Sequence, residues 1–100
     1  MTLKEVKQLF KTMTCLACGT SPVDIAHIQT KGAGGPLELW NLLPLCRKHH
    51  ALHHQIGWIR FGIIYPTVRR ALEMRGWKIE KIGNIHKYRR EDGRSKTNQK

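Results

Sequence analysis

Acidic residues and long apolar runs are both scarce in this sequence, and each shortage excludes a class of protein. Asp and Glu total 7 against 18 Lys and Arg, so the formal net charge is +11. This excess favours a polyanionic partner such as nucleic acid or an anionic membrane, with DNA or RNA leading. The chain has no apolar run long enough to cross a membrane, and its first residues lack the apolar stretch of a signal peptide. We therefore expect a cytoplasmic protein with no membrane partner.

Cysteines number only three, and an odd count argues against a framework of disulfides. Two of them form Cys15-x-x-Cys18, and the third opens Cys46-x-x-His49. Together these side chains are a Cys3His set of the kind that closes tetrahedrally on zinc. A small domain buries a modest share of its surface, so the sequence predicts a structural zinc ion that stabilises the fold. The alternative is a buried Cys46 thiol and a separate redox-active Cys-x-x-Cys pair.

Apolar periodicity and turn residues predict an α+β order of elements. We expect a helix over residues 3–12, a strand over 22–28, a glycine loop over 29–37, a short strand over 42–45 and a helix over about 47–56. A helix beginning at Pro66 and ending near Gly76 should then precede two strands, over 77–82 and 85–88. The predicted organisation is a zinc-containing core with an N-terminal helix (1–57), a basic helix-plus-hairpin extension packed on it (58–90) and a disordered basic tail (91–100).

Four histidines fall within six residues of the helix expected over residues 47–56: His49, His50, His53 and His54. Adjacent helical positions diverge by about 100°, so His49 can face the cysteines while His50 and His54 project together on another side. That spacing predicts a second metal site on His50 and His54. For His53 an exposed, packing or phosphate-contacting role is favoured over ligation.

His27 lies in the strand expected over residues 22–28, and Asn41 follows the glycine loop. A lone histidine in a strand is usually a core residue with its hydrogen bonds satisfied. Here the loop returns the chain to the histidine-rich helix, so we expect a cleft that contains His27, His50 and His54.

The combined pattern resembles that of the HNH endonucleases, which have a ββα-metal (His-Me finger) fold. The resemblance spans roughly residues 14–56 and includes Cys15, Cys18, His27, Gly34, Gly35, Asn41, Leu45, Cys46, His49, His50 and His54. It implies that His27 is the general base and that Asn41 braces the loop and positions this base. His50 and His54 would bind the catalytic divalent ion, which is Mg²⁺, Mn²⁺, Ni²⁺ or Zn²⁺. The sequence around His27 and the glycine loop is also similar to that of small phage and prophage members of the family. This similarity implies that the protein is located in a bacterial or phage-infected host cell.

One position departs from that pattern. Many family members place a metal-binding histidine or aspartate directly before the general base, where this chain has Ala26. Asp24 lies two residues earlier on the same strand face and could supply a carboxylate to the catalytic ion, directly or through water. A turn or solvent-facing role for Asp24 is equally open.

Most of the excess positive charge lies after residue 59, outside the HNH-like segment. This asymmetry indicates a DNA-gripping extension whose phosphate contacts give affinity without sequence choice. The candidates for these contacts are Arg60, Arg69, Arg70, Arg75, Lys78, Lys87, Arg89 and Arg90. We expect a metal-dependent DNA endonuclease that nicks or cuts both strands, in phage DNA processing or recombination. The alternative is a non-catalytic zinc-binding nucleic-acid-binding module, and a homodimer is left open.

Overall fold

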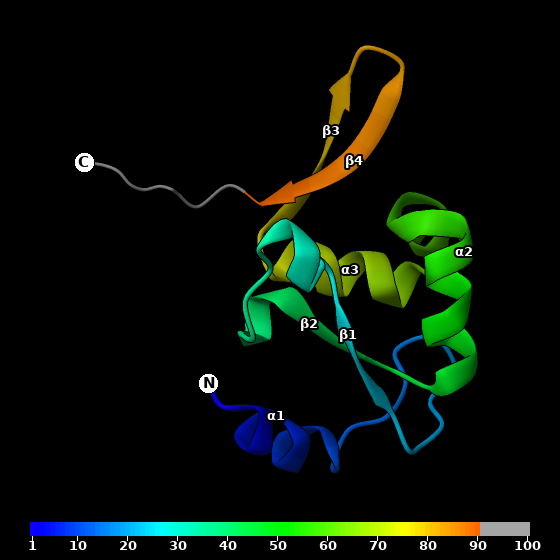
Figure 1. Ribbon diagram of the computed structural model, residues 1–100. Helices are drawn as coiled ribbons and strands as arrows, with labels where there is room; N and C mark the ends of the chain where they lie inside the picture. Colours follow the sequence, from blue (N-terminus) through cyan, green and yellow to red (C-terminus); the bar gives the residue numbers. More distant parts are fainter. Residues whose placement is uncertain (91–100) are drawn as a thin grey trace. The chain divides into compact units, whose positions relative to one another are not determined.

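The computed structural model describes residues 1–90, and the tail expected over residues 91–100 lies outside this range. Within residues 1–90 the fold is α+β, with three helices and two small antiparallel sheets (Figure 1). The α+β class predicted from the sequence is therefore confirmed. The chain forms two compact units, Met1–Gln55 and a second that begins at Ile56. Over residues 1–90, no helix has the length and apolar character needed to cross a membrane.

Helix α1 (Leu3–Phe10) opens the first unit where the sequence predicts a helix. The Thr2 hydroxyl accepts a hydrogen bond from the backbone N–H of Glu5 at 3.1 Å, and the Glu5 carboxylate accepts one from the backbone N–H of Thr2 at 2.8 Å. This reciprocal capping box satisfies two amide groups that a helix N-terminus otherwise leaves unpaired. Val6 and Phe10 form the buried face of the helix.

The first sheet pairs β1 (Asp24–His27) with β2 (Leu42–Leu45), the two strands predicted on either side of the glycine loop. The strands are antiparallel, with His27 opposite Leu42. All of β2 is buried, and Leu42 packs against the buried face of α1. The sheet therefore holds Asp24 and His27 against the core of the first unit.

Helix α2 (Arg47–Ile64) contains a break at Gly57, whose φ is 84° and ψ is 160°. Glycine reaches this left-handed φ without the steric cost that a Cβ imposes, so the first helical part ends where the sequence predicts an end. Helix resumes directly afterwards, over residues for which the sequence predicts no element. The ring of Phe61 is fully buried there, 5.9 Å from that of Trp58 and 4.9 Å from that of Tyr65 between centroids. Aromatic packing explains this helical part.

The second unit also contains helix α3 (Pro66–Met74) and a hairpin of β3 (Trp77–Ile82) and β4 (Ile85–Arg90). Pro66 occupies the first turn of α3, where its missing N–H costs no hydrogen bond. Both strands form as predicted, and β4 extends two residues beyond the expected 85–88. The hairpin has Trp77 as its buried residue, whereas most other positions of both strands are exposed.

Candidate metal centres

A turn over residues 15–20 presents the first two cysteines. Its backbone closes through hydrogen bonds from the Cys15 N–H to the Thr20 carbonyl at 2.8 Å and from the Gly19 N–H to the Cys15 carbonyl at 2.7 Å. Gly19 has a φ of 77°, a conformation that side chains with a Cβ rarely adopt. The Leu16 N–H donates to the Pro44 carbonyl at 3.1 Å, which joins this turn to β2.

The predicted Cys3His set comes together at the junction of β2 and α2. The potential ligand atoms of Cys15, Cys18, Cys46 and His49 all lie within 4.8 Å of one another. The Cys18 and Cys46 Sγ atoms are 3.7 Å apart, and the Cys46 Sγ and His49 Nδ1 atoms are 3.2 Å apart. Tetrahedral zinc with a Zn–S bond of about 2.3 Å separates two sulfur ligands by about 3.8 Å. These four side chains are close enough to hold a metal ion, which suggests a structural zinc site.

The protonation of Cys46 also suits metal binding. Burial raises the pKa of its thiol, but hydrogen bonds, first from the His49 backbone and then from the His49 side chain, outweigh burial and lower the pKa from 9.0 to about 6. The thiolate is the form of cysteine that ligates a metal. Burial raises the pKa of Cys15, so this thiol would release its proton to solvent when an ion binds.

A second group of potential ligands lies on the first part of α2. Ligand atoms of His50, His53 and His54 all lie within 4.8 Å of one another. The sequence predicts His50 and His54 as a pair, and the structure brings these rings to 5.1 Å between centroids. It also places the His53 ring 4.1 Å from that of His54. The three-residue spacing of His50 and His53 is the signal that could have added His53 to this group.

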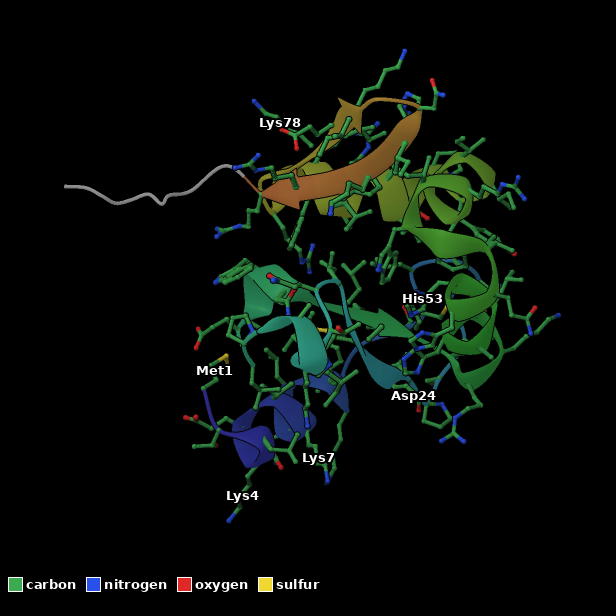
Figure 2. The ribbon with its side chains drawn as sticks, turned by 45° about the horizontal axis from the view of Figure 1, so that its top comes forward. Met1, Lys4, Lys7, Asp24, His53 and Lys78 are labelled. Atoms are coloured by element: carbon green, nitrogen blue, oxygen red, sulfur yellow. The ribbon has the colours of Figure 1, made fainter. Side chains whose placement is uncertain are left out.

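Asp24 contacts this histidine cluster through His50. An oxygen of its carboxylate lies 3.0 Å from His50 Nδ1 and accepts a hydrogen bond from Arg47 Nε at 2.8 Å. The hydrogen bond from His50, followed by that from Arg47, lowers the pKa of Asp24 and keeps it ionised. Figure 2 shows Asp24 and His53 at one end of the first unit, away from Lys4 on α1. With Nδ1 bonded to Asp24, His50 can offer Nε2 to a metal ion.

Asn41 spans the glycine loop from a fully buried position at the end of a 3₁₀ turn (Leu39–Asn41). Its side-chain oxygen accepts a hydrogen bond from the Gln29 N–H at 2.7 Å. Its amide nitrogen donates to the carbonyls of Gln29 at 2.9 Å and Pro36 at 3.1 Å. One side chain therefore ties both ends of the loop that follows His27.

His27 is half-buried at the end of β1. Its Nε2 is buried and has no hydrogen-bond partner in the part of the chain described, residues 1–90. Burial, followed by the charges of Lys31 and His50, lowers its pKa from 6.5, so the ring is neutral at pH 7. The structure forms no hydrogen bond between His27 and the histidine cluster, again within residues 1–90. Because Nε2 is buried, Nδ1 is the ring nitrogen that can exchange a proton with a solvent molecule.

The basic residues predicted to contact DNA fall into an exposed group and a half-buried group. Arg60, Arg69, Arg70, Lys78, Lys87 and Arg89 are exposed. Arg75 and Arg90 are half-buried, and each donates to the main chain: Arg75 to the Ala71 carbonyl at 3.1 Å and Arg90 Nε to the Arg75 carbonyl at 2.8 Å. Those two guanidinium groups already contribute to the internal structure of the second unit.

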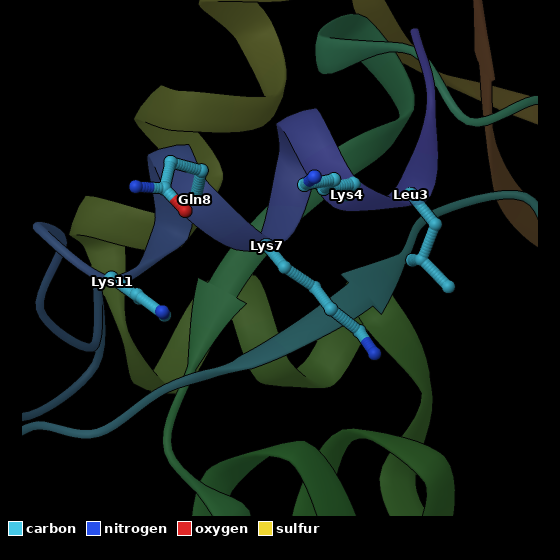
Figure 3. Close-up of a pocket in the computed structure, with 5 residues that line it drawn as sticks. All are labelled: Leu3, Lys4, Lys7, Gln8 and Lys11. Carbon is cyan, nitrogen blue, oxygen red and sulfur yellow. The ribbon is translucent and has the colours of Figure 1, made fainter.

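Another basic surface lies on α1, where sequence reasoning expected no site. Leu3, Lys4, Lys7, Gln8 and Lys11 line a hollow beside this helix (Figure 3). Three and four residues separate the lysines, a spacing that puts them on one helical face. The hollow contains none of the metal-ligand candidates.

Comparison with known proteins gives no match to a family model, a curated protein or a solved structure.

A substitution at Gly35 tests whether the loop that Asn41 braces is closely packed. A Cβ at this position would overlap the Gln29 carbonyl oxygen and lie 2.8 Å from the Asn41 amide nitrogen. We expect Gly35→Ala to destabilise the first unit by about 1–3 kcal/mol, as overpacking of a close contact typically does. Gly32→Ala is the matched control because a Cβ there meets no atom within 4 Å. Equal melting temperatures for the two variants, measured by circular dichroism, would contradict this account.

A substitution at Cys18 tests whether the Cys3His set binds a structural zinc ion. Its side chain is exposed, so Cys18→Ser would change stability by less than about 0.5 kcal/mol if the thiol were an ordinary surface group. Zinc ligation predicts instead that the variant loses the ion and most of the stability of the first unit. Elemental analysis should find zinc bound to the native chain and lost from the variant, with a matching fall in melting temperature. An unchanged melting temperature would exclude ligation by Cys18.

Proposed function

We propose that this protein is a metal-dependent DNA endonuclease of the HNH type, with β1, β2 and the first part of α2 as its ββα-metal core. The observation that carries the proposal is the second cluster of metal ligands on α2, in the same unit as the Cys3His set. A protein that needed zinc for stability alone would require one such cluster. The neutral His27 and the loop-bracing Asn41 add groups suited to hydrolysis.

Phosphodiester hydrolysis requires a proton to leave the attacking water as the bond to the leaving oxygen breaks. His27 can accept this proton at Nδ1, since its lowered pKa keeps the imidazole neutral at pH 7. Asn41 positions the loop that follows His27, and Asp24 orients His50. A divalent ion held by His50 and His54 would stabilise negative charge on a phosphate oxygen and on the leaving 3′ oxygen. The proton for the leaving oxygen comes from solvent.

The β3–β4 hairpin supports DNA as the substrate. Side chains alternate between faces along a strand, and the register pairs Lys78 with Arg89 and Glu80 with Lys87. Lys78, Lys87 and Arg89 therefore share one face of the hairpin, opposite to that of Trp77. Glu80 contacts Arg89 at 3.1 Å, so Lys87 is a stronger candidate than Arg89 for a phosphate contact on this face. The lysines on α1 offer a similar surface on the first unit.

The first test is cleavage of plasmid DNA in the presence of Mg²⁺, Mn²⁺, Ni²⁺ or Zn²⁺. We expect His27→Ala to lower the cleavage rate by about 10²–10⁴-fold, the usual contribution of a general base, with zinc content and DNA affinity retained. His86→Ala removes an exposed histidine of β4 and is the matched control. Native protein that binds DNA but cleaves none with any of the four ions would instead support a non-catalytic zinc module.

The pH dependence of cleavage tests the role of His27 separately. Only the neutral imidazole can act as a base, so activity should fall as the pH decreases through the His27 pKa. Because burial and the charge of Lys31 lower that pKa, the acidic limb of kcat/KM should lie below pH 6.5. Lys31→Gln should move this limb to higher pH, whereas Lys48→Gln should leave it in place. An acidic limb above pH 6.5, or one insensitive to Lys31, would contradict general-base catalysis by His27.

A further inference from the structure

We propose that His53 is the third ligand of the metal site on α2, and that the resulting three-imidazole set selects a transition-metal ion over Mg²⁺. The inference rests on the metal site that the proposed function places on α2, but it does not require that the protein cleave DNA. It assigns His53 a binding role in place of the exposed, packing or phosphate-contacting role that the sequence favours, of which the exposed one is wrong because His53 is buried. It also fills the coordination position for which Ala26 supplies no ligand.

Helical spacing brings the three rings onto one side of α2. His50, His53 and His54 occupy positions i, i+3 and i+4, which are neighbours on a helix surface. Centroids of the three rings are 4.1–5.4 Å apart. Two nitrogens bound to one ion at about 2.1 Å can be separated by up to about 4.2 Å. The ligand atoms lie within 4.8 Å, and the soft χ2 torsion of histidine allows the small remaining approach.

Burial distinguishes His53 from a surface histidine. Its side chain is only 4% exposed, whereas His54 is exposed and His50 is intermediate. The buried ring lies beside the rings of both His50 and His54, with centroids 5.4 Å and 4.1 Å away. An ion at this site would meet one buried ligand and one open to solvent, so it could remain accessible to a phosphate.

Asp24 acts as a positioning residue and not as a ligand. Its carboxylate contacts both His50 Nδ1 and Arg47 Nε through one oxygen, Oδ2. A carboxylate bonded to the distal nitrogen of a ligating histidine fixes the ring and raises its basicity. The protein ligands are then three nitrogens and no oxygen. Imidazole suits Zn²⁺ and Ni²⁺, whereas Mg²⁺ binds through oxygen ligands and gives up its waters reluctantly.

The test measures metal stoichiometry and affinity in the absence of DNA. Native protein equilibrated with Zn²⁺ or Co²⁺ should bind two ions per chain, and a large excess of Mg²⁺ should displace neither. His53→Leu and His53→Gln should keep one ion and weaken binding of the second at least about 100-fold, the upper limit for loss of an outer-shell group. His86→Leu is the matched control and should bind both ions.

Cobalt also reports whether the variants fold. A thiolate-to-cobalt charge-transfer band shows that the Cys3His site is intact, and an all-imidazole site contributes no such band. If both variants lose this band, the native dicobalt protein decides the question. Its paramagnetically shifted imidazole signals should come from four histidines: His49, His50, His53 and His54. A set without His53 would overturn the proposal.

The remaining outcomes separate this inference from the nuclease proposal. Full affinity for the second ion in a folded His53→Leu variant would overturn the role of His53. Native protein that binds one ion but cleaves DNA with Mg²⁺ would overturn it as well and leave the nuclease proposal intact. Native protein that binds two ions through four histidines but cleaves no DNA would support this site and contradict the nuclease.

Discussion

The closure of three cysteines and one histidine at the junction of β2 and α2 is the constraint on which the candidate site depends. Cys46 directly follows the buried strand β2 and His49 lies in the first turn of α2, so the cluster ties both residues to the turn over residues 15–20. Because the His49 side chain faces the three cysteines, the rotation of α2 about its own axis is fixed. That rotation in turn determines that His50 meets Asp24 on β1. The structural cluster and the candidate catalytic cluster therefore share one helix and one rotational setting.

A second constraint is that the loop after His27 has few apolar contacts to order it. Lys31, Gly32, Ala33 and Gly34 are all exposed, so hydrophobic burial can contribute little there. Asn41 provides order instead through three hydrogen bonds from a fully buried side chain. A hydrogen-bonded brace is directional, whereas apolar packing tolerates small shifts. It therefore suits the loop that, in the proposed nuclease, would hold the imidazole of His27 in one orientation.

Features encoded by short spacings could be predicted from the sequence. The capping box of α1, both strands of the first sheet, the end of a helix at Gly57 and the Cys3His set all depend on residues near one another or on well-known ligand spacings. Features that depend on distant contacts could not. The hydrogen bond from Arg90 Nε to the Arg75 carbonyl, for example, links residues fifteen positions apart. Helix over residues 58–64 is a different case: the ring contacts of Phe61 with Trp58 and Tyr65 are local, and the sequence reasoning missed their helical spacing.

Asp24 shows most clearly why site chemistry is harder to predict than site residues. In the sequence it is a carboxylate two positions from Ala26 on the same strand face, and metal ligation and a turn or solvent-facing role are equally open. In the structure its Oδ2 meets both His50 and Arg47, two residues of a helix that strand periodicity does not consider. Under the proposal that Asp24 positions His50, its carboxylate leaves the ligand set, and His53 is the side chain that lies within ligand distance of His50 and His54. The proposed preference for a transition-metal ion then depends on a contact between β1 and α2.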